Sequence, residues 1–154
     1  MLPHVILLSY MLIGQFTHEI DSKKRVILPS KWRKSLGAQV IVTTGLDTAL
    51  FIYTVKEWEK IAEKLGEMSF GNQDARHFNR FMLSNAFLTD VDTQGRILIP
   101  ETLKAYAHIQ EKIVFVGVHS RVEMWSEDLW KTYQEKNLAD VDTIASKLNS
   151  MGVL

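Results

Sequence analysis

Short apolar runs, many of them alternating with polar residues, recur along the chain between residues typical of turns. Such runs predict β-strands, whereas longer segments with apolar residues three and four positions apart predict amphipathic helices. The expected strands are 14–20, 25–28, 39–45, 49–54, 86–91, 96–99, 112–117 and 121–125. The expected helices are 29–37, 55–66, 72–86, 100–108, 127–137 and 140–154. Short strands and short helices are therefore both expected along the whole chain.

Residues at the ends of these segments support the assignment. Pro29 and Pro100 suit the first turn of a helix, where the missing N–H group is harmless. Gly37 suits the position just after a helix. Thr54 has capping-box spacing ahead of the helix at 55–66, and Ser126 can cap the next such helix.

The chain contains the same pattern twice. Residues 20–29 read IDSKKRVILP and residues 91–100 read VDTQGRILIP. A shift of 71 residues aligns Asp21 with Asp92 and Arg25 with Arg96. At a shift of 72 the aromatic pairs Tyr53 with Trp125 and Trp58 with Trp130 also coincide. Self-similarity of this kind indicates that a whole unit was duplicated, and we expect the two copies to pack as one pseudo-symmetric body.

Each copy places an Asp and an Arg on either side of three loop residues. Asp21 and Asp92 can accept hydrogen bonds from N–H groups of a turn, and we expect each to face its Arg across a tight hairpin. Gly95 can supply a positive φ in the second loop. Lys24 holds the same place in the first loop, where it can adopt a positive φ only with strain. One interpretation is a salt bridge that fixes the hairpin. The other is a ribbon tip whose Arg reaches DNA, because such a ribbon fits the major groove.

The formal net charge is zero, but the charges are unevenly distributed. Six bases and one acid lie between residues 21 and 34, and seven acids and four bases lie between 111 and 142. The six bases are Lys23, Lys24, Arg25, Lys31, Arg33 and Lys34. A locally basic face can bind phosphate on a neutral molecule, although a charge run can also be a solvated face.

The sequence offers no candidate for catalysis or for a metal site. The absence of cysteine excludes disulfides, thiolate zinc sites and thiol nucleophiles. The five histidines are scattered without H-x-x-x-H spacing, and no phosphate-binding, dinucleotide-binding or serine-nucleophile motif is present. We therefore predict no enzyme activity and no cofactor.

The apolar segment 1–16 is a poor signal peptide, because it lacks a basic start and a small-residue cleavage site. Interruptions at Ser9 and Gly14 leave it too short for a membrane span of about 20 residues. It is either an additional edge strand or, as we favour, extra chain ahead of a natural start at Met11.

Four segments together resemble the MraZ family of bacterial transcriptional regulators. They are 11–33, 45–59, 91–107 and 112–130, and they include both copies of the D-x-x-x-R signature. The resemblance implies an α+β fold: two pseudo-symmetric SpoVT-AbrB-type units with swapped β-hairpins (a double-split β-α-β arrangement) and flanking helices in one chain. It also implies a ring of several chains that contacts direct repeats in promoter DNA. Members of the family usually repress the division and cell-wall gene cluster, including their own gene, which implies a cytoplasmic, nucleoid-associated protein.

The resemblance implies the following division of the chain. The units are an N-terminal extension with the start of the first strand (1–14), unit 1 (15–57), connecting helices (58–85), unit 2 (86–129) and a C-terminal helical segment (130–154).

Carried over position by position, Lys23, Arg25 and Arg96 are the implied DNA contacts, and Lys24 replaces the Gly usual in the family and adds a cation. Asp21, Asp92 and Gly95 are expected to structure the loops. The alternative is a ring-forming scaffold or an antitoxin-like partner binder on the same fold. Three successive cations in the first loop favour DNA, because a scaffold does not need them.

Overall fold

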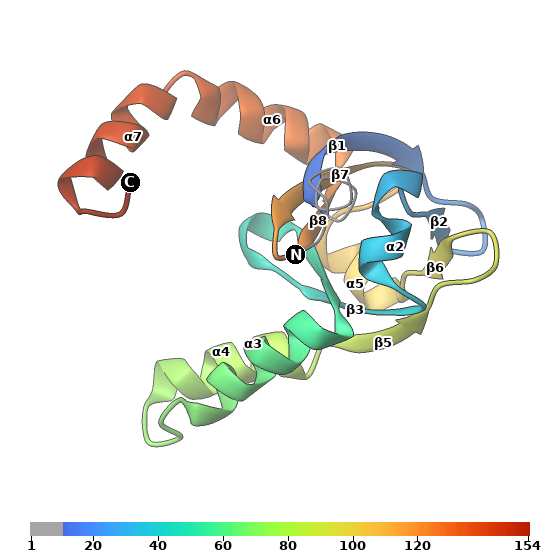
Figure 1. Ribbon diagram of the computed structural model, residues 1–154, viewed down its shortest axis with the longest axis horizontal. Helices are drawn as coiled ribbons and strands as arrows, with labels where there is room; N and C mark the ends of the chain where they lie inside the picture. Colours follow the sequence, from blue (N-terminus) through green and yellow to red (C-terminus); the bar gives the residue numbers. More distant parts are fainter. Residues whose placement is uncertain (1–10) are drawn as a thin grey trace, which may run out of the picture.

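A computed structural model describes residues 11–154, so the expectations for residues 1–10 lie outside the described part of the chain. Short strands and helices alternate along it (Figure 1), which confirms the predicted α+β class. The strands are β1 (Leu12–Glu19), β2 (Arg25–Ile27), β3 (Gln39–Thr44), β4 (Leu50–Thr54), β5 (Phe87–Asp90), β6 (Arg96–Leu98), β7 (Lys112–His119) and β8 (Val122–Ser126). The helices are α2 (Arg33–Leu36), α3 (Val55–Glu67), α4 (Gln73–Leu83), α5 (Glu101–Tyr106), α6 (Glu127–Leu138) and α7 (Val141–Ser150), with 3₁₀ turns η1 (Ser30–Trp32) and η2 (Leu46–Thr48).

The helix ends follow the predicted signals. The Thr54 hydroxyl accepts a hydrogen bond from the N–H of Glu57 at 3.1 Å, and the Ser126 hydroxyl accepts one from the third residue of α6 at 3.3 Å. Gly37 follows α2 with φ 82°. The segment after Pro29 differs from the continuous helix expected, because it begins as the 3₁₀ turn η1 before α2.

Six strands form one antiparallel sheet in the order β1-β7-β8-β4-β3-β5. The order is unchanged when the strands of one repeat are exchanged for those of the other, so the sheet is pseudo-symmetric. The first strand of each repeat pairs with a strand of the other repeat: β1 with β7, and β5 with β3. The two repeats are therefore interleaved rather than side by side.

The remaining two strands, β2 and β6, pair with each other as a separate ribbon. The ribbon is centred on the pair Val26–Ile97, and the large sheet is centred on the pair Phe51–Glu123. Both pairs join equivalent positions of the two repeats. The prediction that the strands before and after each Asp loop pair as a hairpin is wrong, because these strands pair with different partners.

The central strands β3, β4, β7 and β8 of the large sheet are largely buried on both faces, whereas the edge strands β1 and β5 are mostly exposed. Alternate residues of a strand point to opposite faces, and in β3 the side chain of Val42 enters one apolar core while that of Ile41 enters the other. The first core lies between the sheet and the β2–β6 ribbon and includes Trp32. The second core is covered by residues of α3, α4 and the start of α6.

The aromatic residues that coincide in the repeat are equivalent in the structure as well. The rings of Tyr53 and Trp58 lie 5.6 Å apart between centroids, and those of Trp125 and Trp130 lie 5.1 Å apart. Both pairs pack in the second core, with Tyr53 and Trp125 buried and the other two rings partly buried. Together with Trp32 in the first core, these aromatic side chains form part of the apolar interior.

The helices that follow each repeat break the symmetry. Helices α3 and α4 fold back on each other beside the sheet, whereas α6 and α7 extend away from the body as an arm (Figure 1). No residue of α6 or α7 is buried, and Leu138, Val141 and Met151 are exposed. Across residues 11–154, no helix combines the length and apolar character that a membrane crossing requires.

Candidate nucleic-acid interface

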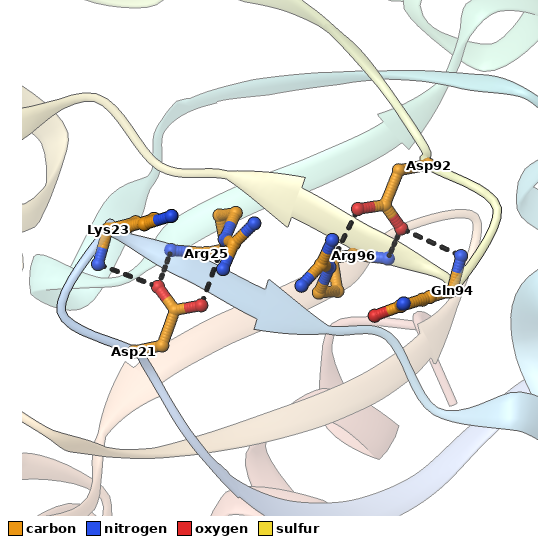
Figure 2. A network of polar contacts seen from close by, with 6 residues as sticks. All are labelled: Asp21, Lys23, Arg25, Asp92, Gln94 and Arg96. Atoms are coloured by element: carbon orange, nitrogen blue, oxygen red, sulfur yellow. Dashed lines mark hydrogen bonds and ion pairs between the residues drawn. The ribbon is translucent and has the colours of Figure 1, made fainter.

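The loop of the first repeat is closed around the carboxylate of Asp21 (Figure 2). Its Oδ1 accepts hydrogen bonds from the backbone N–H groups of Lys23 and Arg25, both at 2.9 Å. Its Oδ2 accepts one from Nε of Arg25, also at 2.9 Å. The N–H of Asp21 in turn donates to the carbonyl of Arg25 at 2.8 Å. One carboxylate thus fixes both the loop backbone and the direction of the Arg25 side chain.

The loop of the second repeat repeats this geometry. Asp92 Oδ1 accepts from the N–H groups of Gln94 at 2.9 Å and Arg96 at 2.8 Å, and Oδ2 accepts from Arg96 Nε at 2.7 Å. The third loop residue has a positive φ in both copies, 62° at Lys24 and 80° at Gly95. The two loops share only Asp and Arg, so these two residues account for the common conformation.

The electrostatics of each carboxylate reflect these contacts. The hydrogen bond from the N–H of Arg25 is the largest cause that lowers the pKa of Asp21 below its ordinary value, and the Arg25 guanidinium lowers it further. The N–H of Arg96 and then its guanidinium lower the pKa of Asp92 in the same way. Partial desolvation opposes the shift in both loops. Both carboxylates are therefore charged at neutral pH.

Pairing of β2 with β6 brings the two arginines onto one face. Residues directly opposite in an antiparallel pair share a face, and the ribbon pairs Arg25 with Leu98 and Ile27 with Arg96. The inner face carries Val26 and Ile97, each 1% exposed. On the outer face, Ile27 is 44% and Leu98 is 53% exposed. The outer face thus presents two guanidinium groups and two apolar side chains.

The loops are also tied to the opposite strand. The N–H of Leu28 donates to the carbonyl of Gly95 at 2.9 Å, and the N–H of Ile99 donates to that of Lys24 at 2.8 Å. Each loop is therefore held by its own Asp and by the other repeat. This support makes the positions of Arg25 and Arg96 depend on both copies being present.

The arginines keep their terminal nitrogens available. Within the described residues, Nε is the only guanidinium atom of Arg25 or Arg96 that donates to a protein acceptor. Their side chains are 30% and 25% exposed. Lys23 is exposed at the first loop and takes part in no ion pair within residues 11–154. These three residues are free to meet an anion.

Lys24 differs from the other predicted contacts. Its Nζ lies 2.9 Å from Oε2 of Glu101, in the first turn of α5. At the second loop, the side chain beside Gly95 is that of Arg33, which donates from Nε to the carbonyl of Leu28 at 3.2 Å. A Cβ added at Gly95 would lie 2.4 Å from the guanidinium carbon of Arg33. A side chain at position 95 would therefore displace the Arg33 guanidinium group, and Gly95 also suits the positive φ of this position.

Sequence reasoning did not single out Glu101 or Arg33 as neighbours of the loops. The local pattern places Glu101 only in a helix and Arg33 only in a run of six bases. The signal was present in the repeat, because both residues follow the proline that ends the loop-strand pattern. The missing information was the interleaving, which puts each of these segments beside the loop of the other copy.

Comparison with known proteins gives one family. The family model described as "MraZ protein, putative antitoxin-like" matches residues 11–81 and again 82–149. A protein of Clostridium botulinum (strain Eklund 17B) is 46% identical over 143 residues, which is 93% of this chain and all of that protein. A protein of Caldanaerobacter subterraneus is 44% identical over the same length and coverage. A protein of Caldicellulosiruptor bescii is 46% identical over 144 residues, again 93% of this chain and all of its own. Each of the three is named a transcriptional regulator MraZ, a name that denotes no enzyme.

Proposed function

The chain belongs to the MraZ family, and from this premise we propose that it is a sequence-specific DNA-binding transcriptional regulator. The observation that carries the proposal is the outer face of the β2–β6 ribbon. There Arg25 and Arg96 are each held at Nε by a loop carboxylate, and their terminal nitrogens remain available. A guanidinium oriented in this way suits guanine edges or phosphate, which accept two parallel hydrogen bonds.

The other residues of this surface have separate roles in the proposal. Lys23 supplies attraction to the phosphate backbone, which depends on salt and not on sequence. Ile27 and Leu98 are exposed between the arginines and can contact thymine methyl groups. Asp21 and Asp92 do not touch DNA but hold the arginines in a fixed direction, which reduces the entropy lost on binding.

The regulated genes in this proposal are the division and cell-wall gene cluster, including the gene of the protein itself. The protein acts there as a repressor and contacts direct repeats in the promoter through both Asp-x-x-x-Arg loops. Such action takes place at the nucleoid. Footprinting on the DNA upstream of its own gene tests this directly: protection of spaced repeats is expected, and the absence of any protected region argues against it.

Assembly into a ring of several chains is the second part of the proposal. The α6–α7 arm supports it, because Leu138, Val141 and Met151 beyond the start of α6 are exposed in the described chain. An apolar groove of about 360 Å³ between α3, α4 and β4 also remains open, lined by Phe51, Ile61 and Met82 among others. Sedimentation at micromolar concentration should give a closed oligomer, and a monomer alone would exclude the ring.

The competing function is a scaffold or antitoxin-like binder that uses the same fold without DNA. It predicts that the protein does not bind duplex DNA at any salt concentration. Retention on heparin with elution at moderate salt favours the DNA-binding function, because heparin and DNA are both polyanions that bind a basic protein surface.

A further inference from the structure

The two loops have the same backbone but different neighbours. At the first loop the ammonium group of Lys24 lies 2.9 Å from the carboxylate of Glu101, which belongs to the other repeat. The positions equivalent to these two residues are Gly95 and Ser30, which have no charge. The ion pair therefore exists on one side of the pseudo-symmetric body only.

We propose that Glu101 competes with DNA phosphate for Lys24 and thereby lowers the DNA affinity of the first loop. This inference rests on the proposed function, because it assigns a regulating residue to the same DNA-binding surface. Lys24 then contributes less to DNA attraction than its sequence position suggests, and Lys23 and Arg25 remain the effective cations of the loop.

The exposure of the pair makes such competition feasible. The side chains of Lys24 and Glu101 are 44% and 62% exposed, so water and salt screen their attraction. A phosphate that approaches the loop can therefore replace the carboxylate without opening a buried contact. Glu101 is ionised at neutral pH, since the hydrogen bond from Lys24 lowers the pKa of its carboxyl.

Backbone hydrogen bonds hold the loop in place while the ammonium group of Lys24 exchanges Glu101 for phosphate. The N–H of Lys24 donates to the carbonyl of Asp21 at 3.0 Å, and its carbonyl accepts from Ile99 at 2.8 Å. The loop therefore keeps its conformation whether the ammonium group meets Glu101 or phosphate. Loss of Glu101 should change DNA binding without changing the positions of the arginines.

A double-mutant cycle tests the inference on the full chain. The variants are Glu101→Gln, Lys24→Gly and the two combined, and the probe is a mixed-sequence duplex DNA. The readout is the slope of log K against log salt, in which each neutralised phosphate contributes about 0.9. Glu101→Gln should steepen the slope by up to about 0.9, which corresponds to about 3.5-fold in relative affinity across a fourfold range of salt. In the Lys24→Gly background the same change should have a much smaller effect.

A matched control separates the local effect from net charge. Glu57→Gln removes the same charge and breaks a similar exposed pair, with Lys60 at 3.0 Å, on α3 at a distance from both loops (Figure 1). It should leave the slope as in the parent. Circular dichroism should be the same for all variants at neutral pH. Thermal unfolding should match the parent for the two glutamine variants and should rise slightly for Lys24→Gly, because Gly relieves the strain of the positive φ at this position.

Three results would overturn the inference. In the first, Glu101→Gln behaves like Glu57→Gln. In the second, the gain persists in full after Lys24→Gly. In the third, Lys24→Gly alone flattens the slope by about 0.9, since Lys24 would then already be bound to phosphate. If the parent binds DNA in these cases, the proposed function stands and only the role of Glu101 is lost. If the parent binds no duplex DNA, both fail.

Discussion

Replacing Arg25 or Arg96 by alanine is expected to weaken operator binding and to leave the fold intact. In each side chain Nε is committed to a loop carboxylate, at 2.9 Å in the first loop and 2.7 Å in the second. The two terminal nitrogens can therefore make one bidentate contact with a base or phosphate. A bidentate base contact contributes about 1–3 kcal/mol, so each alanine variant should lose about 5- to 150-fold in affinity.

The two losses should be nearly additive. Arg25 and Arg96 share no hydrogen-bond partner within the described residues, because each is held by the carboxylate of its own loop, so neither substitution removes a partner of the other. Lysine variants separate charge from geometry at the same positions. Arg25→Lys and Arg96→Lys keep the cation but lose the planar pair of donors, so the salt dependence should persist while discrimination between operator and mixed-sequence DNA falls.

The assay is operator affinity by fluorescence anisotropy at several salt concentrations, with a mixed-sequence duplex for comparison. Circular dichroism and sedimentation show whether fold and assembly are retained. Parent-like binding by both alanine variants would mean that the arginines only fix the loops. Loss of binding that always accompanies unfolding would assign the Asp–Arg pairs a purely structural role.

Three further outcomes follow from the same geometry. Lys23→Ala should flatten the slope of log K against log salt by about 0.9 if its ammonium group meets one phosphate, and an unchanged slope at equal folding would remove Lys23 from the interface. The lowered pKa of Asp92 means that its contribution to stability is present above its ordinary pKa of 3.8 and is lost as pH falls through the lower folded value. Thermal unfolding of the parent should therefore fall more steeply below about pH 4 than that of Asp92→Asn, and parallel curves would contradict this. The side chain of Ile97 is 1% exposed, so Ile97→Ala should lower the free energy of unfolding in urea by about 2–5 kcal/mol. The side chain of Leu98 is 53% exposed, so Leu98→Ala should change it by less than about 0.5 kcal/mol. Equal losses would show that the inner face of the ribbon is not the buried one.

Local features of the fold could be predicted because they depend on neighbouring residues. The hydroxyl of Thr54 lies three residues before the N–H group that it caps, and Gly37 ends a helix in its own turn. The bonds from Asp21 to Arg25 span four residues, so the facing of Asp and Arg was also predictable. The duplication indicated that the second loop would repeat the first.

Strand pairing could not be predicted in the same way. The alternation of apolar and polar residues in a strand indicates which face is apolar, but it does not indicate which distant strand pairs with it. A β1–β2 hairpin would satisfy the alternation around Asp21, yet β1 pairs with β7 over eight residues, from Leu12–His119 to Glu19–Lys112. The longer ladder gains more backbone hydrogen bonds than a hairpin limited by the three residues of β2. The place of Lys24 beside Glu101 depends on the pairing of β2 with β6, another pairing between distant strands, and could not be predicted for the same reason.

Interleaving two repeats in one chain also explains how the loops came to differ. In a symmetric dimer of single-repeat chains every substitution appears twice, so both loops must carry the same residues. A fused chain has no such constraint, and here the third loop residue is Lys24 on one side and Gly95 on the other. Symmetric dimers match palindromic half-sites, because the symmetry of the protein is mirrored in the DNA. A body with two unequal loops has a direction, and copies that associate head to tail would repeat that direction. Exchanging the third loop residues, Lys24→Gly with Gly95→Lys, should displace the Arg33 guanidinium group at the second loop. The difference between the loops fits the direct repeats of the proposed function better than a palindrome.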